Sequence, residues 1–205
     1  MRALTIMLPK RVSCFLSGSV AVLSLWGVLA SAGSSNRLDN SWKKYRNPKL
    51  GYCVSYPTRW YKGDAFEGSG LFVETGAKKF SKPVGEIDVA AVSTPADTGS
   101  HAASLTLVDD WKLHLDGLAK FERAERMEVL EQRPLTLVGK PALFTKDRYY
   151  DPLERATWIE ELVFAHREDV VYRLELECRA DQVERFEPVF TRFINTFQFE
   201  CSAGH

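Results

Sequence analysis

The sequence predicts an α+β protein in which an antiparallel β-sheet is flanked by two helices. Three observations predict it: runs that alternate between apolar and polar residues, one segment of helical period between two groups of such runs, and an apolar stripe near the C-terminus. This order lacks the strict alternation of strand and helix found in doubly wound nucleotide-binding folds. We therefore expect one α+β domain over residues 42–201, followed by a tail at 202–205.

The first group of strands is expected before residue 93. The predicted strands are 42–45, 52–56, 71–74 and 86–92. In the second of them Tyr52, Val54 and Tyr56 share one face, and Pro57 ends the strand. The stretch 93–103 contains Pro95 and Gly99 and is expected to be a loop.

The first helix is predicted at about 106–120. Apolar residues recur there at helical spacing, namely Val108, Trp111, Leu115 and Leu118. Thr106 is followed three residues later by Asp109, which is the spacing of a capping box. Asp109 and Asp110 also suit the positive end of the helix dipole.

Strand patterns resume after this helix. They cover 125–131, 141–150, 156–165 and 170–178, and the last two form a predicted hairpin joined by 166–169. In the final arm Tyr172, Leu174, Leu176 and Cys178 share one face, opposite Arg173, Glu175 and Glu177. The charged face predicts a solvated or edge position for this arm.

The last element is a helix. Asp181 with Glu184 is a start signal, and an apolar stripe follows at Phe186, Phe190, Phe193 and Phe197. Pro188 lies inside that pattern. It either kinks the helix or opens the main helix after a short first turn.

The N-terminus has the pattern of an export signal. Arg2, Lys10 and Arg11 precede an uncharged run from Val12 to Asn36, and Ala30-Ser31-Ala32 offers an A-x-A cleavage site. We expect a signal peptide at 1–32, a flexible tether at 33–41, and a periplasmic or extracellular location. The alternative is an uncleaved membrane anchor, because the uncharged run is long enough to span a bilayer.

Charge argues against nucleic acid as a partner. The whole chain carries 27 basic and 27 acidic residues, and without residues 1–32 it carries 24 against 27. A mildly acidic exported protein has no electrostatic reason to bind DNA or anionic lipid. Membrane contact is expected only if the N-terminal segment is retained.

Three cysteines remain after the signal: Cys53, Cys178 and Cys201. Thiols tend to pair outside the cytoplasm, and three of them allow three single pairings. We favour Cys53 with Cys201, because both lie near the ends of the mature chain and chain ends often meet.

Motifs for catalysis or cofactors are few in the sequence. It has no G-x-S-x-G, H-E-x-x-H, C-x-x-C or phosphate-binding loop, so we expect no cofactor and no catalytic residue. Asp110 and His114 are four residues apart on the first helix and are weak metal candidates, two ligands being too few for a tight site. Glu160 and Glu161 straddle both faces of a strand, so that one of them is placed to point inward.

Aromatic side chains are the main candidates for ligand or partner binding. Tyr56, Trp60, Tyr61 and Phe66 cluster before the third strand, and Tyr149 and Tyr150 lie at a hairpin tip. If exposed, they form a platform for a sugar or a peptide; the alternative is that they pack in the core.

The run Gly51-Tyr52-Cys53-Val54-Ser55-Tyr56-Pro57-Thr58-Arg59-Trp60, with Ile194-Asn195-Thr196-Phe197 closing the last helix, resembles the PsbP-like proteins. These are the extrinsic PsbP subunit of photosystem II and its exported bacterial relatives, and Mog-type Ran-binding proteins share their fold. The resemblance covers roughly residues 45–198. It implies an α/β/α sandwich around an antiparallel sheet and a non-enzymatic binding or assembly role.

We therefore expect an exported, non-catalytic domain that binds a protein partner or a small ligand in the cell envelope. The alternative is a secreted hydrolase with a dispersed acid pair or a Cys–His site. The latter would join Cys53 or Cys178 to His101, His114 or His166.

Overall fold

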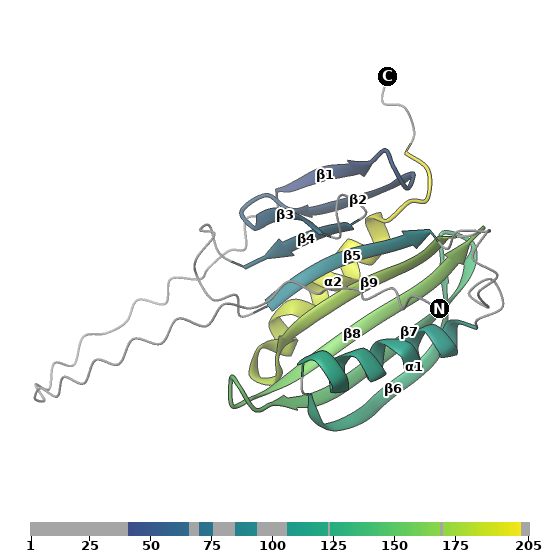
Figure 1. The fold of residues 1–205 in the computed structure, drawn as a ribbon. Helices are drawn as coiled ribbons and strands as arrows, with labels where there is room; N and C mark the ends of the chain where they lie inside the picture. The colour runs from purple at the N-terminus through teal and green to yellow at the C-terminus, as the bar shows by residue number, and fades with distance from the viewer. Residues whose placement is uncertain are drawn as a thin grey trace, which may run out of the picture. The chain divides into compact units, whose positions relative to one another are not determined.

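The computed structural model of the chain is drawn in Figure 1. It describes residues 41–65, 70–75, 85–93, 106–122, 124–168 and 170–201. All of these belong to the unit Arg37–His205, the other unit of the chain being Met1–Asn36. The expected signal peptide, its cleavage site, residues 33–40 of the tether, Phe66 and His101 lie outside the described residues. Within the described ranges, no helix has the length and apolar character needed to cross a membrane.

Seven antiparallel strands form the main sheet, in the order β3-β4-β5-β9-β8-β7-β6. Their bounds in that order are Tyr61–Ala65, Gly70–Glu74, Gly85–Ser93, Val170–Arg179, Ala156–Arg167, Lys140–Asp151 and Glu125–Leu137. A separate two-stranded sheet pairs β1 (Trp42–Asn47) with β2 (Tyr52–Pro57). The predicted antiparallel α+β class is confirmed.

The two helices also follow the prediction. α1 covers Leu107–Gly117 and continues into a π-helical turn at Leu118–Glu122, while α2 covers Val183–Thr196. Thr106 and Asp109 form the predicted capping box, each side chain accepting a backbone N–H of the other residue. Pro188 lies inside one continuous α2, which starts after a 3₁₀ turn at Ala180–Gln182 without a side-chain cap.

The helices cover opposite faces of the main sheet (Figure 1). On β8, Leu162 and Phe164 pack in a small cluster with Trp111 of α1. Their neighbours Val163 and Ala165 point the other way, into the larger core that contains the phenylalanines of α2. The larger core therefore fills the space between α2 and the sheet, and a smaller one lies under α1.

The prediction that the charged face of β9 is solvated or at an edge is wrong. β9 is the central strand, paired on one side with β5 and on the other with β8. The side chains of Arg173 and Glu175 are only 19% and 13% exposed. The charges of this face are therefore tolerated by pairing with one another and with α1, rather than by water.

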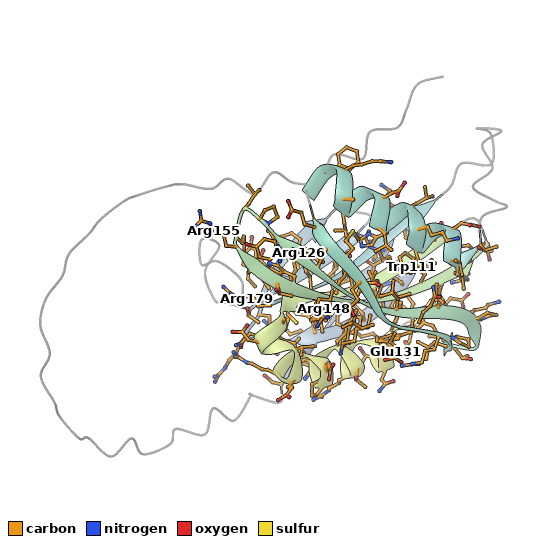
Figure 2. All side chains as sticks on the ribbon, turned by 90° about the horizontal axis from the view of Figure 1, so that it is seen from below. Trp111, Arg126, Glu131, Arg148, Arg155 and Arg179 are labelled. Atoms are coloured by element: carbon orange, nitrogen blue, oxygen red, sulfur yellow. A yellow bond between two sulfur atoms is a disulfide. The ribbon has the colours of Figure 1, made fainter. Side chains whose placement is uncertain are left out.

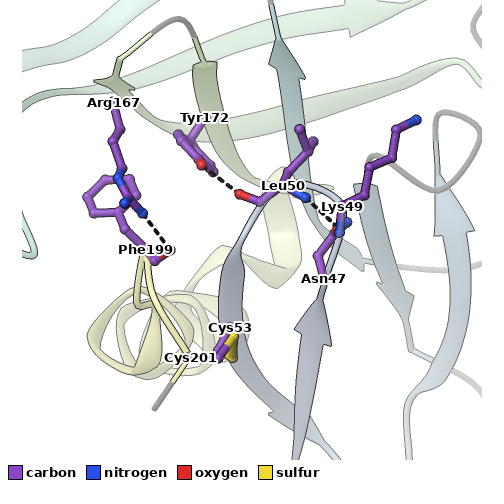
Figure 3. The surroundings of a disulfide bond; sticks show 8 residues. All are labelled: Asn47, Lys49, Leu50, Cys53, Arg167, Tyr172, Phe199 and Cys201. Atoms are coloured by element: carbon purple, nitrogen blue, oxygen red, sulfur yellow. Dashed lines mark hydrogen bonds between the residues drawn. A yellow bond between two sulfur atoms is a disulfide. The ribbon is translucent and has the colours of Figure 1, made fainter. Parts of the chain in front are cut away.

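A disulfide joins the two ends of the described domain (Figure 3). Cys53 of β2 pairs with Cys201, whose Cα lies 5.5 Å away, and Cys53 also exchanges backbone hydrogen bonds with Gln198. Tyr172 donates to the carbonyl of Leu50 beside this junction. The pairing is the one that the positions of the cysteines favoured, and Cys178 remains free and buried.

Candidate functional site

The first aromatic cluster belongs mainly to the core. Tyr56 is buried, and Trp60 is partly buried, with its ring edge-on to Phe186 of α2. Tyr61 packs beside Phe72 across the β3–β4 pair. The structure therefore does not gather Tyr56, Trp60 and Tyr61 into an exposed platform, because the first two rings pack in the core beside α2 and the third packs on Phe72.

The second aromatic pair divides between two environments. Tyr149 is buried and its hydroxyl donates to Glu177 of β9. Tyr150 is half-buried on the neighbouring position and lies under the guanidinium of Arg126. Adjacent residues of a strand face opposite ways, so the two rings do not make one binding surface.

The register of the sheet creates a row of carboxylates that the sequence did not reveal. Asp147 of β7 lies opposite Glu160 of β8, Glu160 opposite Glu177 of β9, and Glu177 opposite Glu86 of β5. Glu74 of β4 continues the row. Like charges directly across a sheet repel one another, so this row needs protons or positive partners.

Under α1, four side chains of this region form a closed ring of contacts. Arg173 Nη1 lies 2.7 Å from Nδ1 of His114, and His114 Nε2 lies 2.8 Å from Oε1 of Glu160. Arg173 Nε lies 3.0 Å from Oε2 of Glu175, and the ligating atoms of His114, Glu160 and Glu175 all lie within 4.8 Å of one another. We call these four residues the α1 ring.

Burial sets the ionisation of the ring. It raises the pKa of Glu160 to about 8 and also raises the pKa of Glu175. Burial, with the positive charge of Arg173, lowers the pKa of His114 to about 4. The ring therefore holds a neutral imidazole and at least one protonated carboxyl group near neutral pH.

The hydrogen bonds of His114 do not suit a metal ion. A histidine that binds a metal through Nε2 carries its proton on Nδ1 and usually donates it to an acceptor. In the α1 ring, Nδ1 of His114 instead faces Arg173, which is only a donor. His114, Glu160 and Glu175 thus have the residue types of a metal site, but the guanidinium occupies the place of the required acceptor.

The sequence-based metal candidates Asp110 and His114 turn to different partners. Asp110 of α1 pairs with His166 of β8, while His114 pairs with Glu160. Both contacts help to fix α1 on the sheet. Figure 2 shows Trp111 of the same helix on the side that faces the strands, and its indole Nε1 donates to Asp147 at 3.0 Å.

The opposite face of the sheet carries an open cleft of about 300 Å³ between α2 and the strands β6 and β7. Phe144 and Phe190 contribute its apolar part. Lys146 also lines the cleft and pairs with Glu161 of β8 at 3.0 Å and with Glu187 of α2. Sequence analysis missed this cleft, because it depends on how α2 crosses the sheet.

The Cys–His alternative fails on geometry among the described residues. Cys53 is bonded to Cys201. Cys178 lies in the α2 core, whereas His114 and His166 contact the α1 side of the sheet. Burial also raises the pKa of the Cys178 thiol to about 12, so it is not a nucleophile at neutral pH.

The dispersed acid pair of the hydrolase alternative has a counterpart in Glu160 and Glu175. However, Glu160 is 0% exposed and lies beneath α1, so a substrate has no direct approach to it. A glycosidase-type pair needs an open site in which the sugar fits between the two groups. This pair lacks such a site.

The described elements define the class of the fold. An antiparallel sheet lies between two helices that cover its opposite faces, and a two-stranded β1–β2 ribbon is tied to the C-terminal segment. This arrangement is a PsbP-like fold.

Among solved structures, the chain is similar to cyanobacterial PsbP from Synechocystis sp. PCC 6803. The two share 15% identity, 84% of this chain and 99% of that chain are covered, and the TM-score is 0.57. A second similar structure is LpqN of Mycobacterium tuberculosis, described as involved in cell envelope biogenesis, with 11% identity over 77% of this chain and 90% of that chain and a TM-score of 0.48. No protein-family profile matches the sequence, and no curated protein matches it. At such identities the likeness concerns the fold alone.

Proposed function

We propose that this chain is an exported, non-catalytic binding or assembly-accessory domain that acts on a protein partner or a small ligand in the cell envelope. The observation that carries the proposal is the separation of its two polar sites. The α1 ring is closed beneath a helix, while the cleft beside α2 is open and combines an apolar part with charged groups. Such a combination is typical of binding sites.

The cleft is suited to a side chain or short segment of a partner. Its volume of about 300 Å³ lies at the small end of the range for ligand pockets. Lys146 is already balanced by two carboxylates, so an approaching group meets a polar surface with little net charge. We therefore place the partner contact along α2, at Asn195 and Thr191.

Two further observations support the cellular location. The N-terminal residues have the pattern of an export signal, and Cys53 is bonded to Cys201. Disulfides persist mainly in oxidising compartments outside the cytoplasm. A PsbP-like fold with these features fits an accessory role in the envelope.

Site-specific photo-cross-linking in the native host tests the proposal. A benzoylphenylalanine is introduced at Asn195, which lines the cleft, and in a matched control at Glu184, which is exposed on the same helix outside it. We expect one stoichiometric adduct from position 195 and none from position 184 after irradiation of intact envelopes. Equal adducts from both positions, or a clean monomer from both, contradict a protein partner at the cleft. The N-terminus of the recovered chain tests cleavage after Ala32.

A further inference from the structure

The hydrogen-bond pattern of the α1 ring fixes the tautomer of His114. Arg173 has only donors, so Nδ1 of His114 must be the acceptor of their 2.7 Å contact. The remaining proton of the neutral imidazole then lies on Nε2, which donates to Oε1 of Glu160 at 2.8 Å. The donor and the acceptor of both hydrogen bonds of His114 are therefore fixed.

The ring closes only if one more positive group lies between the two glutamates. Oε2 of Glu160 accepts no hydrogen bond, although the residue is completely buried. A ligating oxygen of Glu175 lies within 4.8 Å of one of Glu160. Ionised carboxylates are acceptors only, so two of them this close in a buried site need a proton or a cation between them.

Arg173 favours the proton over a metal ion. A divalent cation at His114 Nε2 would move the imidazole proton to Nδ1, directly against the Arg173 donor. A shared proton leaves every contact of the ring in place. With Arg173 positive, His114 neutral and one glutamate protonated, the ring itself carries no net charge.

We propose that Glu160 and Glu175 share one proton, that this proton holds α1 on the sheet, and that its loss in alkaline solution loosens α1. This inference is independent of the proposed partner binding at the cleft. In this inference the packing of α1 on the sheet depends on the shared proton, and α1 is the element that moves when the proton is lost.

The groups around the shared proton strengthen the dependence on pH. The charged and titratable groups facing it are His114 of α1, Asp147 of β7, and Arg173 and Glu177 of β9. On the other neighbouring strand, β5, the register position opposite Glu175 is Asp88. Two carboxylates, Asp147 and Glu177, stand here against the single cation Arg173, because the imidazole of His114 is neutral. A second negative charge in the ring therefore meets uncompensated repulsion.

α1 is well placed to respond to that repulsion. Trp111 is its only buried residue, and the apolar cluster beneath it is small. Leu107, Val108 and Leu115 of α1 add only partly buried packing. The polar attachment is through side-chain contacts of Asp110, Trp111 and His114 with residues of the sheet. When both glutamates are ionised, the contact between His114 and Glu160 no longer balances the repulsion between the two carboxylates.

The test uses the full mature chain with 5-fluorotryptophan and ¹⁹F NMR, because the Trp111 resonance reports whether the indole is buried. The wild type is titrated from about pH 6 to about pH 9, a range that includes the raised pKa of Glu160. Glu160→Gln is the key variant, since the amide oxygen still accepts from His114 and the amide nitrogen supplies a permanent donor to Glu175. Glu131→Gln, at an exposed position, is the matched control.

We expect the Trp111 resonance of the wild type and of E131Q to move toward an exposed environment with a midpoint near pH 8, and that of E160Q to stay fixed. Far-UV circular dichroism verifies that E160Q is folded, and Glu175→Gln, which also supplies a donor, gives a second variant with the same expected flat response. A wild type without the transition overturns the proposal, as does a transition that survives in both Gln variants. Stoichiometric Zn²⁺ binding that E160Q abolishes also overturns it, in favour of a metal site.

Discussion

The indole Nε1 of Trp111 donates to Oδ2 of Asp147 at 3.0 Å, which joins the one buried residue of α1 to a buried carboxylate of the sheet. Thr145 donates to the same oxygen at 3.1 Å. Burial raises the pKa of Asp147, and the two hydrogen bonds oppose that shift. The contact therefore anchors α1 on the sheet and stabilises the ionised form of the buried Asp147 carboxylate.

Replacing Trp111 by Phe is expected to lower the free energy of unfolding by about 1.5 to 3 kcal/mol, because a hydrogen bond to a buried charged group is lost. Urea denaturation measures the change. Leu113→Ala on the same helix is the control, and since Leu113 is 58% exposed we expect it to cost roughly 0.5 kcal/mol or less. Equal costs for the two variants would show that the anchor is not specific.

The disulfide is expected to stabilise the domain strongly. The bonded cysteines are 148 residues apart, and closing so long a loop in the unfolded chain is worth about 3 to 5 kcal/mol. Cys201→Ala, or reduction of the wild type, should lower the free energy of unfolding by that amount. Reductant should have no further effect on C201A, and an unchanged wild type in reductant would contradict the assignment.

Lys146 is expected to be important for stability as well as for the cleft. Glu161 is 6% exposed, and its pKa is raised by burial despite its contact with Lys146. Lys146→Met leaves this carboxylate without its cation and should cost about 1 to 3 kcal/mol, a value reduced because the pair is partly solvated. Lys120→Met is the control, because Lys120 and its partner Asp116 are both 67% exposed. A cost as small as that of K120M, measured in urea, would refute a structural role for Lys146.

Stability is expected to fall as the pH rises from about 6.5 toward 8. The folded chain keeps a proton on Glu160 up to its raised pKa of about 8, whereas the unfolded chain releases it near 4.5. The stabilisation is thus complete below pH 4.5 and is lost as the pH rises through 8, at up to about 1.4 kcal/mol per pH unit.

His114 acts in the opposite sense at lower pH. Its pKa falls from 6.5 to about 4 on folding, so between these values the unfolded chain binds a proton that the folded chain does not. Stability contributed by His114 therefore rises with pH in that interval and offsets the loss from Glu160. Urea denaturation of the wild type and of E160Q across the pH range measures both effects, and a wild type no steeper than E160Q above pH 6.5 would refute the assignment to Glu160.

Much of the fold was predictable from local patterns. The capping box at Thr106, the phenylalanine stripe of α2 and the β8–β9 hairpin each depend on spacing along one segment. β3 was missed because Tyr61–Ala65 is short and includes Gly63, against which the Phe72 ring of the next strand packs.

The candidate sites were less predictable, because they depend on register between strands. Arg173 and Glu175 alone indicated a solvated face, and only the central position of β9 brings them under α1. For Glu160 and Glu161, the sequence predicted that only one of the two points inward. In the structure both are buried, on opposite faces of the sheet. The sequence feature that could have indicated the α1 ring is the charged face of the last strand together with His114 on the first helix.

The shared proton is tested most directly by observing the glutamate carboxyl groups themselves. Chains labelled with ¹³C at the glutamate side-chain carboxyl are titrated by NMR, and the spectra of wild type and E160Q are subtracted to assign Glu160. We expect a Glu160 carboxyl that is protonated at neutral pH and titrates near pH 8, with Glu175 becoming ionised at lower pH in E160Q. A Glu160 signal that titrates in the ordinary acidic range would contradict the account.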